Sequence, residues 1–475
     1  MPAEPRSDRD TPSGDWAFTL AAAAVALLPR LFVAIAWARE PVWDGHYYHA
    51  GAERIAEGLG YSEDVMIGGH AVWKPVTHYP VGYSAILAIA YKLAGSGLVV
   101  APLFNVLIGS ALVVVVHRLA RHWLSPTRAR IAAGLTALHP GLIAYTAVVM
   151  TESLAALLLL LSGLFAVRWR NARGVLAAGV TLGLATLVRP SSLLAVPLLA
   201  LIKPRPALRA IVGSGLALVI ALGVVLPWTI RNCIRMDGCA LVSTNGGWNL
   251  AIGALTDTGR FRTLRAADGC PVVTGQVQQD RCWAKVGLSA ILKAPGGWLA
   301  LAPKKLAQTY DHESFAIEYL READPTQWPE PRRIAARQLL TWFHRLLLGA
   351  AVLAGVALVT RRPMQGPSFV ERIGGRPWLA QGAALAALAA LFVYAVMSDD
   401  HPFFWLALAA PLLAVLHLPG RPTQGATGRF LLGLLFATSL THVLFFGDDR
   451  YHIVVSPVLC LLGAAALRKS ESENP

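Results

Sequence analysis

Long uninterrupted hydrophobic segments dominate the pattern along the chain. The clearest run from Trp16 to Trp37, from Val148 to Val167, from Ile211 to Trp228 and from Gly428 to Phe446. Each is long enough to cross about 30 Å of hydrocarbon as an α-helix. Polar connections, many of them basic, separate these segments. The pattern therefore predicts an all-α polytopic membrane protein.

The composition agrees with this prediction. Hydrophobic residues make up 55% of the 475 residues and charged residues 15%, and the mean hydropathy is +0.51. A soluble globular protein of this size carries more charge on its surface. The first hydrophobic segment is long, and no small-residue cleavage site precedes Glu40, so we expect it to remain as the first span.

The formal net charge of +14 comes from basic residues at the ends of the hydrophobic segments. These short clusters form no groove-sized patch, which argues against a nucleic-acid partner. An excess of Lys and Arg is typical of the cytoplasmic connections of membrane proteins. The clusters that we assign to the cytoplasm are Arg118, Arg121, Arg128 and Arg130; Arg168, Arg170 and Arg173; Lys203, Arg205 and Arg209; Arg361, Arg362, Arg372 and Arg376; Arg421 and Arg429; and Arg468 and Lys469.

The remaining connections should then lie on the extracytoplasmic side. They include the acidic segment from Arg39 onward and the long segment from Arg231 to about Arg337. Counting residues 83–94 as a crossing would move the cluster at Arg118 to the outer side, against the charge rule. Because residues 83–94 are too short for a comfortable span, we expect them to form a helix in the membrane interface.

These assignments predict roughly twelve transmembrane helices with both termini in the cytoplasm, together with interfacial helices in the first outer loop. We divide the chain into three parts. Residues 1–230 form an N-terminal catalytic module that includes the first outer loop, 39–97. Residues 231–337 form an extracytoplasmic loop, and residues 338–475 form a C-terminal transmembrane bundle.

Four of the five cysteines, Cys233, Cys239, Cys270 and Cys282, fall in the long outer segment. Paired disulfides in an oxidising compartment are the natural interpretation. Three pairings are open, and Cys233 with Cys239 and Cys270 with Cys282 are the local choices. A zinc site of four thiolates is the alternative, although the spacing such sites favour is missing. Cys460 lies in the last span and is expected to pack there.

Several short motifs follow one another in a fixed order. The first outer loop contains Trp43-Asp44-Gly45-His46-Tyr47-Tyr48-His49-Ala50, then Gly58-Leu59-Gly60-Tyr61 and Tyr79-Pro80-Val81-Gly82-Tyr83. Later motifs are Met150-Thr151-Glu152-Ser153, Leu187-Val188-Arg189-Pro190, Leu226-Pro227-Trp228 with Arg231-Asn232, Ser243-Thr244-Asn245-Gly246-Gly247-Trp248-Asn249-Leu250 and Gly447-Asp448-Asp449-Arg450-Tyr451. Each motif alone is short and degenerate, so their order and spacing carry the weight.

This arrangement resembles the glycosyltransferase C superfamily over most of the chain, in particular family 39 and its bacterial relatives. Those relatives include protein O-mannosyltransferases, lipid A aminoarabinose transferases and galacturonosyltransferase-like proteins. The resemblance implies a hexosyl or pentosyl transferase that takes its sugar from a polyprenyl-phosphate donor on the extracytoplasmic face. It also implies that Asp44 is catalytic.

Sugar transfer to a hydroxyl or amine needs a base for the acceptor proton and cations for the leaving phosphate. Asp44 is the candidate base, and its alternative role is to cap the helix that starts near Gly45. Glu152, at the outer end of its span, is the second catalytic candidate and could position the acceptor or a metal. Its alternative role is to complement the dipole of its helix.

Basic residues on the outer side are candidates for binding the donor phosphate, since a phosphate needs charge-assisted hydrogen-bond donors. Arg450 with Tyr451 is the first choice, followed by Lys74, His78 and Arg189. Each of these basic residues could instead reach a lipid headgroup. The residues that we place near the acceptor or the sugar are Tyr48, Tyr79, Asn245 and Trp248. Arg30 lies inside the first span, where an arginine suggests a function, although it could instead reach for the outer interface or pair with an acid of another helix.

No metal site can be assigned from the sequence. His46 and His49 stand one helical turn apart, but no carboxylate–histidine spacing of a hydrolytic enzyme accompanies them. A divalent ion that bridges carboxylates and the lipid phosphate stays open. We therefore assign no certain cofactor.

Two other classes of function stay open. A transporter or lipid flippase would also be basic and polytopic, although we find no repeated halves of the kind such proteins often have. A glycan ligase or polymerase would use a polyprenyl-diphosphate oligosaccharide instead. The sugar and the acceptor, whether lipid, glycan or protein, are undetermined. We expect a multi-pass protein of a bacterial inner (plasma) membrane, with its active site facing the periplasm or exterior and with membrane lipid as a partner.

Overall fold

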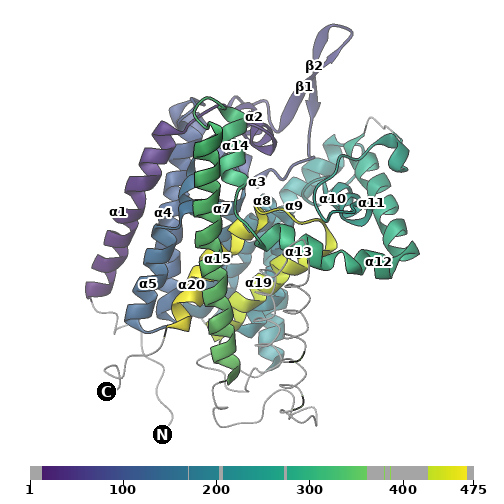
Figure 1. Cartoon of the computed structure of the whole chain (residues 1–475). Helices are drawn as coiled ribbons and strands as arrows, with labels where there is room; N and C mark the ends of the chain where they lie inside the picture. The colour runs from purple at the N-terminus through teal and green to yellow at the C-terminus, as the bar shows by residue number, and fades with distance from the viewer. Residues whose placement is uncertain are drawn as a thin grey trace.

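The computed structural model describes residues 13–168, 171–202, 207–271, 275–360 and 426–467, and the single positions 379 and 386. Helices dominate these residues, and several long ones stand side by side as a bundle (Figure 1). Of the predicted cytoplasmic clusters, Arg170, Lys203, Arg205, Arg361, Arg362, Arg372, Arg376, Arg421, Arg468 and Lys469 lie outside the described residues.

The N-terminal part of the bundle has α4 at its centre, packed against α1, α5 and α7, while α8 bridges α7 and α9. α5 starts at Pro126, whose missing N–H is no loss there because the first turn of a helix leaves its N–H groups without carbonyl partners. α8 starts after Asn171, whose side chain accepts a hydrogen bond from the Gly174 N–H. The elements are α1 (Ser13–Ala36), α4 (Val100–Arg121), α5 (Pro126–Ala137), α6 (Pro140–Ala144), η2 (Tyr145–Ala147), α7 (Glu152–Arg168), α8 (Ala172–Val188), η3 (Pro190–Ala195), η4 (Pro197–Leu201) and α9 (Ala207–Arg235).

Four helices of the described residues are long and apolar enough to cross a membrane, which makes this a membrane protein. They cover Asp15–Ala36, Val100–Arg121, Leu208–Arg235 and Thr427–Leu444. Shorter apolar helices cover Gly82–Ala94, Ala172–Val188, Pro190–Leu201 and Tyr451–Ala466. These helices confirm the prediction of a helical, membrane-spanning protein, and they do not confirm the number of roughly twelve spans.

Two helices and a hairpin form the first outer loop. The predicted helices are present as α2 (Asp44–Ala56) and α3 (Gly82–Ala94), which pack together. Between them, β1 (Ser62–Ile67) and β2 (His70–Pro75) pair antiparallel and project from the molecule (Figure 1).

The sequence analysis had not predicted these strands. Gly68 and Gly69 adopt φ values of 60° and 82°, the left-handed conformation that a tight two-residue hairpin turn requires. The Gly-Gly pair was the one local indication of a hairpin turn, but each strand beside it has only six residues.

The segment between α9 and α15 (Glu330–Thr360) is largely helical, and its helices α10 to α12, within residues 246–300, lie to one side of the bundle (Figure 1). The disulfides Cys233–Cys239 and Cys270–Cys282 tie it together, so the two local pairings hold and the thiolate zinc site is excluded. Cys460 is buried without a partner cysteine. The elements are α10 (Gly246–Leu255), η5 (Ala266–Asp268), α11 (Gln276–Lys293), α12 (Pro295–Ala300), α13 (Ala302–Tyr310) and α14 (Phe315–Ala323).

The last described part consists of α19 (Ala426–Leu444), η7 (Tyr451–Val455) and α20 (Ser456–Ala466). α20 packs against α15 and α5, which returns the end of the chain to the N-terminal bundle. Both divisions proposed from the sequence, after residues 230 and 337, fall inside continuous helices, α9 and α15.

Arg30 is completely buried in α1 and has a structural partner. Its guanidinium donates hydrogen bonds to the carbonyl oxygens of Ala137, at 2.7 Å, and Thr136, at 3.2 Å. These carbonyls belong to the C-terminal turn of α5, where free carbonyls and the helix dipole favour a cation. Arg30 therefore binds a helix end, rather than the acidic partner or the interface considered from the sequence.

Candidate active site

The candidate active site begins where α2 begins. Trp43 has a φ of 50° and is the one non-glycine residue with a positive φ among the residues that the structure describes. Its ring packs against Phe315 and Tyr319 of α14, with centroids 5.6 Å and 5.9 Å away. Gly45 lies against the Tyr319 ring, where a Cβ has no room. The residue after this positive-φ position is Asp44.

Asp44 is bound on both carboxylate oxygens. Tyr79 Oη donates to Oδ1 at 2.8 Å, and Arg450 Nη1 donates to Oδ2 at 2.6 Å. Burial raises the pKa of Asp44, but the charge of Arg450 and the hydrogen bonds from Arg450 and Tyr79 outweigh burial, so its pKa lies below the usual value. The carboxylate is thus ionised at neutral pH and able to accept a proton.

Arg450 connects Asp44 to two further side chains. Nη2 donates to Tyr451 Oη at 3.2 Å, and Nε lies 3.8 Å from Asp448 Oδ1. The guanidinium also lies over the rings of Phe315 and Tyr451, 5.3 Å and 5.0 Å from their centroids. Burial raises the pKa of Asp448 to about 6, against the opposing effect of Arg450.

A second ion pair stands beside the first. Glu152, the first residue of α7, is fully buried, and its Oε1 accepts from Arg189 Nη1 at 2.8 Å. The same Nη1 lies 3.1 Å from Thr151 Oγ1. The Arg189 guanidinium lies 5.4 Å from the Tyr451 ring centroid, so Arg189 and Arg450 both contact Tyr451.

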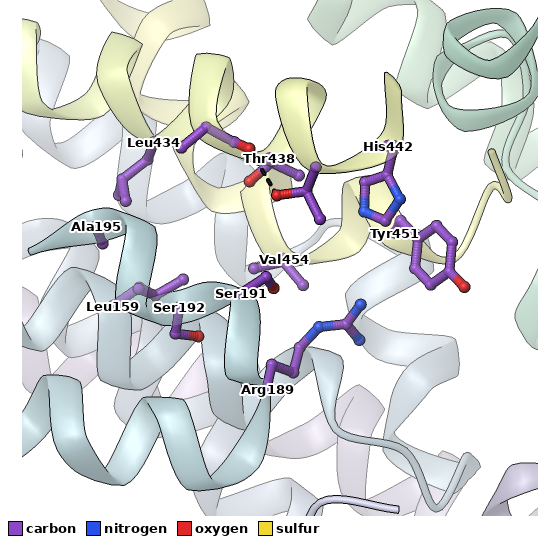
Figure 2. A pocket seen from close by; sticks show the side chains of 12 residues that line it. Leu159, Arg189, Ser191, Ser192, Ala195, Leu434, Thr438, His442, Tyr451 and Val454 are labelled. Carbon is purple, nitrogen blue, oxygen red and sulfur yellow. Dashed lines mark hydrogen bonds between the residues drawn. The ribbon is translucent and has the colours of Figure 1, made fainter. Parts of the chain in front are cut away.

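A narrow pocket opens at Tyr451 and Arg189. Figure 2 shows Arg189, His442 and Tyr451 at one end of the pocket, and Leu434 and Ala195 at the other. The rings of His442 and Tyr451 are stacked, with centroids 4.0 Å apart. The pocket thus combines a cationic end with walls of apolar, serine and threonine side chains from α7, η3, α19 and η7.

A second, larger pocket includes Asp448, which contacts Arg450. It has about 740 Å³ of empty space that opens to solvent, and most of its lining side chains are charged or polar. Asp448 and Asp449 line it together with Arg260, His312 and Arg337. The Asp44–Arg450 pair therefore connects, through Tyr451 and Asp448, to residues of two separate pockets.

Other predicted site residues lie close to Tyr79. The Tyr48 ring is buried and contacts the rings of Tyr79 and Tyr83, with centroids 5.5 Å and 5.8 Å away. The His78 ring lies between Tyr79, at 4.9 Å, and Trp248, at 5.8 Å. Burial lowers the pKa of His78, against the opposing charge of Asp44.

Two predicted residues occupy positions apart from Asp44. Lys74 lies on β2 opposite Glu63, in the projecting hairpin. Asn245 precedes α10, and its Oδ1 accepts from Ser243 Oγ at 2.9 Å. His46 and His49 also have separate contacts, since His49 pairs with Tyr91 Oη and Glu53 while the His46 ring faces Tyr47.

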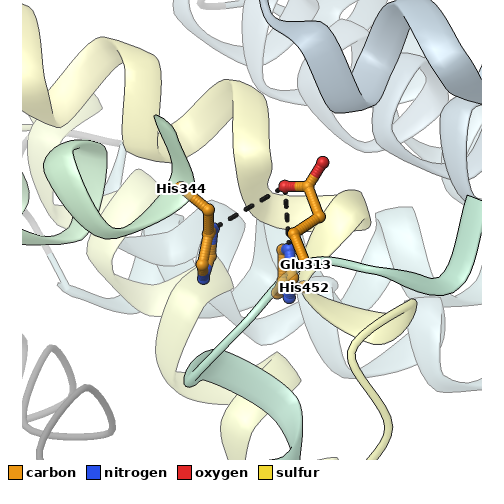
Figure 3. Close-up of side chains that lie close together, drawn as sticks. All are labelled: Glu313, His344 and His452. Atoms are coloured by element: carbon orange, nitrogen blue, oxygen red, sulfur yellow. Dashed lines mark hydrogen bonds and ion pairs between the residues drawn. The ribbon is translucent and has the colours of Figure 1, made fainter. Parts of the chain in front are cut away.

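A group that could hold a metal lies elsewhere, at Glu313, His344 and His452 (Figure 3). The sequence analysis missed these three residues, as it missed Phe315 and the contact of Asp448 with Arg450. They are far apart along the chain and have no regular spacing, so no local signal could have joined them.

Part of the chain matches a known protein family. Residues 78–230 match the family model described as dolichyl-phosphate-mannose-protein mannosyltransferase. No curated protein matches the chain.

Several solved structures are similar to the chain, two of them from different proteins. One is the oligosaccharyltransferase AglB from the archaeon Archaeoglobus fulgidus in complex with an inhibitory peptide and a dolichol-phosphate, at 16% identity and a TM-score of 0.43 over 94% of this chain. The chain spans 50% of the length of that protein. The other is ArnT from Cupriavidus metallidurans bound to undecaprenyl phosphate, at 16% identity and a TM-score of 0.38 over 96% of this chain and 78% of that one.

The matched range starts at the loop that carries Tyr79 and contains Glu152 and Arg189. It therefore includes one partner of Asp44 and the whole of the second ion pair. Protein mannosyltransferases are among the relatives that the sequence motifs indicated. The match of residues 78–230 to this family model confirms that resemblance.

Proposed function

We propose that the protein transfers a sugar from a polyprenyl-phosphate donor to an acceptor on the extracytoplasmic face of the membrane. The observation that carries this proposal is the ionised Asp44 carboxylate bound by Arg450, which also contacts Tyr451 of one pocket and Asp448 of the other. A base, a phosphate-binding cation and two separate binding sites are what such a transfer requires.

The donor is assigned to the pocket of Figure 2. Its leucine, alanine and valine side chains suit an isoprenoid chain, and Arg189 at its cationic end suits the phosphate. Arg450 also contacts Tyr451 and would contact the same phosphate. Lys74 and His78 have supporting roles in this proposal, with Lys74 contacting lipid headgroups at the membrane surface.

The acceptor is assigned to the polar pocket lined by Asp448 and Asp449. Asp44 takes the proton from the acceptor hydroxyl or amine, whose oxygen or nitrogen forms a bond to the anomeric carbon. The bond between that carbon and the phosphate oxygen breaks, and its electron pair leaves with the polyprenyl phosphate. Arg450 and Arg189 stabilise the charge that develops there. Inversion at the anomeric carbon is what the superfamily resemblance implies.

Donor binding also prepares the base. In the unliganded site, Arg450 is shared with Asp44 and lowers its pKa. A phosphate that draws Arg450 toward itself weakens this ion pair, so the pKa of Asp44 rises and the carboxylate becomes a stronger base. Proton removal is thereby favoured only when the donor is present.

The remaining assignments follow the superfamily resemblance. Residues 1–230 are the catalytic module, residues 231–337 shape the acceptor or donor site, and residues 338–475 complete the bundle. Tyr48, Asn245 and Trp248 lie near the sugar or acceptor. The protein spans a bacterial inner membrane with both termini in the cytoplasm, and its sugar is a hexose or a pentose.

The test is transfer of labelled sugar from a panel of polyprenyl-monophosphate sugars to membrane extracts by the purified full-length protein. Asp44→Asn should lower transfer by about 10²- to 10⁴-fold, the usual contribution of a general base, while donor binding is retained. Asp64→Asn is the matched control. Asp64 lies in the hairpin and pairs with Arg54 of α2, so this substitution should leave transfer unchanged.

Three results would contradict the proposal. Unchanged transfer by Asp44→Asn with loss in Asp448→Asn would move the base to Asp448. Transfer from polyprenyl-diphosphate donors alone would favour a glycan ligase or polymerase. Absence of transfer from every donor, with movement of lipid or solute in liposomes, would favour a transporter.

A further inference from the structure

Three buried side chains from distant parts of the chain converge behind the Arg450 loop. Glu313 precedes α14, His344 lies in the middle of α15, and His452 lies in η7 (Figure 3). One ligand atom from each residue lies within 4.8 Å of those from the other two. The side chains of the two histidines are 0% exposed and that of Glu313 is 2% exposed.

The hydrogen bonds define where each imidazole carries its proton. His452 Nδ1 lies 2.7 Å from the carbonyl oxygen of Thr309, and His344 Nε2 lies 3.0 Å from that of Tyr310. A carbonyl oxygen only accepts, so both of these nitrogens donate. In a neutral imidazole, the opposite nitrogens, His452 Nε2 and His344 Nδ1, are then left with lone pairs.

Both lone-pair nitrogens point at the same carboxylate. Glu313 Oε2 lies 3.2 Å from His452 Nε2 and 3.9 Å from His344 Nδ1. His344 Nδ1 and Glu313 Oε1 have no hydrogen-bond partner among the described residues. Three buried acceptors that face one another repel unless a positive ion lies among them.

Protons are a poor way to supply that positive charge. The rings of His344 and His452 are stacked with centroids 3.8 Å apart, so protonating both would place two cations face to face beside one carboxylate. Protonating one would leave the other nitrogen as a buried acceptor without a donor. A single divalent ion would satisfy all three acceptors together.

We propose that Glu313, His344 and His452 bind a divalent transition-metal ion of the zinc type. Two imidazoles and a carboxylate are common zinc ligands, and ligand atoms of a tetrahedral site lie about 3.3 Å apart. The observed separations of 3.2 Å and 3.9 Å approach this value. Each histidine also donates its second N–H to a backbone carbonyl, the usual outer support of a metal-binding imidazole.

Gly141 leaves room for the Glu313 carboxylate. A Cβ at Gly141 would overlap Glu313 Oε1, so the glycine leaves the space that the carboxylate occupies. The second oxygen of Glu313 or a water molecule would complete four ligands.

The proposed metal has a structural role near the active site. His452 follows Arg450 by two residues, and Glu313 precedes Ser314 and Phe315, whose backbone N–H groups donate to Asp449. The Phe315 ring also lies under the Arg450 guanidinium. A metal that joins Glu313 to His452 would hold the Arg450 loop against the start of α14. This consequence rests on the proposed function, whereas the metal site itself does not.

The test measures metal content and therefore does not depend on finding a substrate. The full-length protein is purified in detergent, equilibrated with zinc and dialysed extensively against metal-free buffer, and zinc per chain is determined by mass spectrometry. We expect about one zinc per chain in the wild type. His344→Asn and His452→Gln should lose it, and Gly141→Ala should bind zinc about 10- to 100-fold more weakly, because it displaces a supported ligand.

His117→Asn is the matched control, since His117 is another fully buried histidine but contacts Thr19 in a different part of the bundle. It should retain the full zinc content. Absence of stoichiometric zinc from the wild type, together with no thermal stabilisation by zinc or cobalt, would overturn the proposal and leave a proton-sharing histidine–glutamate cluster. Because the wild type alone decides this point, failure of a variant to fold does not affect the test.

Discussion

Two ion pairs lie next to Tyr451, and their carboxylates differ in burial. The carboxylate of Glu152 is 1% exposed, and Arg189 is its charged partner. The carboxylate of Asp44 is 25% exposed, and its partner Arg450 also contacts Asp448 at the polar pocket. A buried pair mainly has to remain intact, because either charge alone is costly there. A partly exposed pair can exchange partners, as a catalytic base and a phosphate ligand must.

The largest expected effect is on stability, at the buried pair. Arg189→Gln leaves the Glu152 carboxylate without its cation and should lower the free energy of unfolding by about 3–5 kcal/mol. Thermal unfolding in detergent measures the loss. The double variant Glu152→Gln/Arg189→Gln removes both charges and should recover most of it, whereas equal instability of single and double variants would mean that the pair is not coupled.

The next largest effect should be on activity, at the partly exposed Asp44–Arg450 pair. Arg450→Gln removes the cation that serves the leaving phosphate and should lower kcat by about 10²- to 10³-fold, as loss of one stabilising donor does. Its thermal unfolding should change less than that of Arg189→Gln. A larger stability loss in Arg450→Gln than in Arg189→Gln would mean that the Asp44–Arg450 pair is the more important of the two for stability.

A smaller effect should appear in the pH profile. Tyr79 donates to Asp44 and helps to lower its pKa, so Tyr79→Phe should raise that pKa. Because the base must be ionised, the loss of kcat/KM on acidification should begin at a higher pH in the variant than in the wild type. The pH–rate profiles of the two proteins test this, and an acid limb that stays in place would remove Tyr79 from the base assembly.

The smallest effect is expected in the hairpin. Lys74 faces Glu63 across the strands and is separate from both ion pairs, so Lys74→Ala should change the donor KM by no more than about fivefold, corresponding to about 1 kcal/mol. A loss as large as that of Arg450→Gln would mean that the hairpin contacts the donor phosphate directly.

The sequence by itself predicted the features that depend on local patterns. Continuous apolar segments indicated the membrane helices, because a helix must present apolar side chains to lipid wherever it crosses. Short motifs singled out Asp44, Glu152, Arg189 and Arg450 before any of their contacts was known. The two local disulfide pairings were among the predicted choices and are confirmed. The hairpin at 62–75 was missed, because a short strand pair with a Gly-Gly turn contrasts little with a polar loop.

Only the tertiary structure decided which of these residues meet. Asp44 and Arg450 are 406 positions apart, and Glu313 and His452 are 139 apart. Such contacts depend on how helices pack, and no periodicity along the chain records that packing. The same packing gave Arg30 a helix end as its partner and buried Glu152 while leaving Asp44 partly exposed. Local sequence thus determined which groups are available for chemistry, and the packing of distant segments determined their partners.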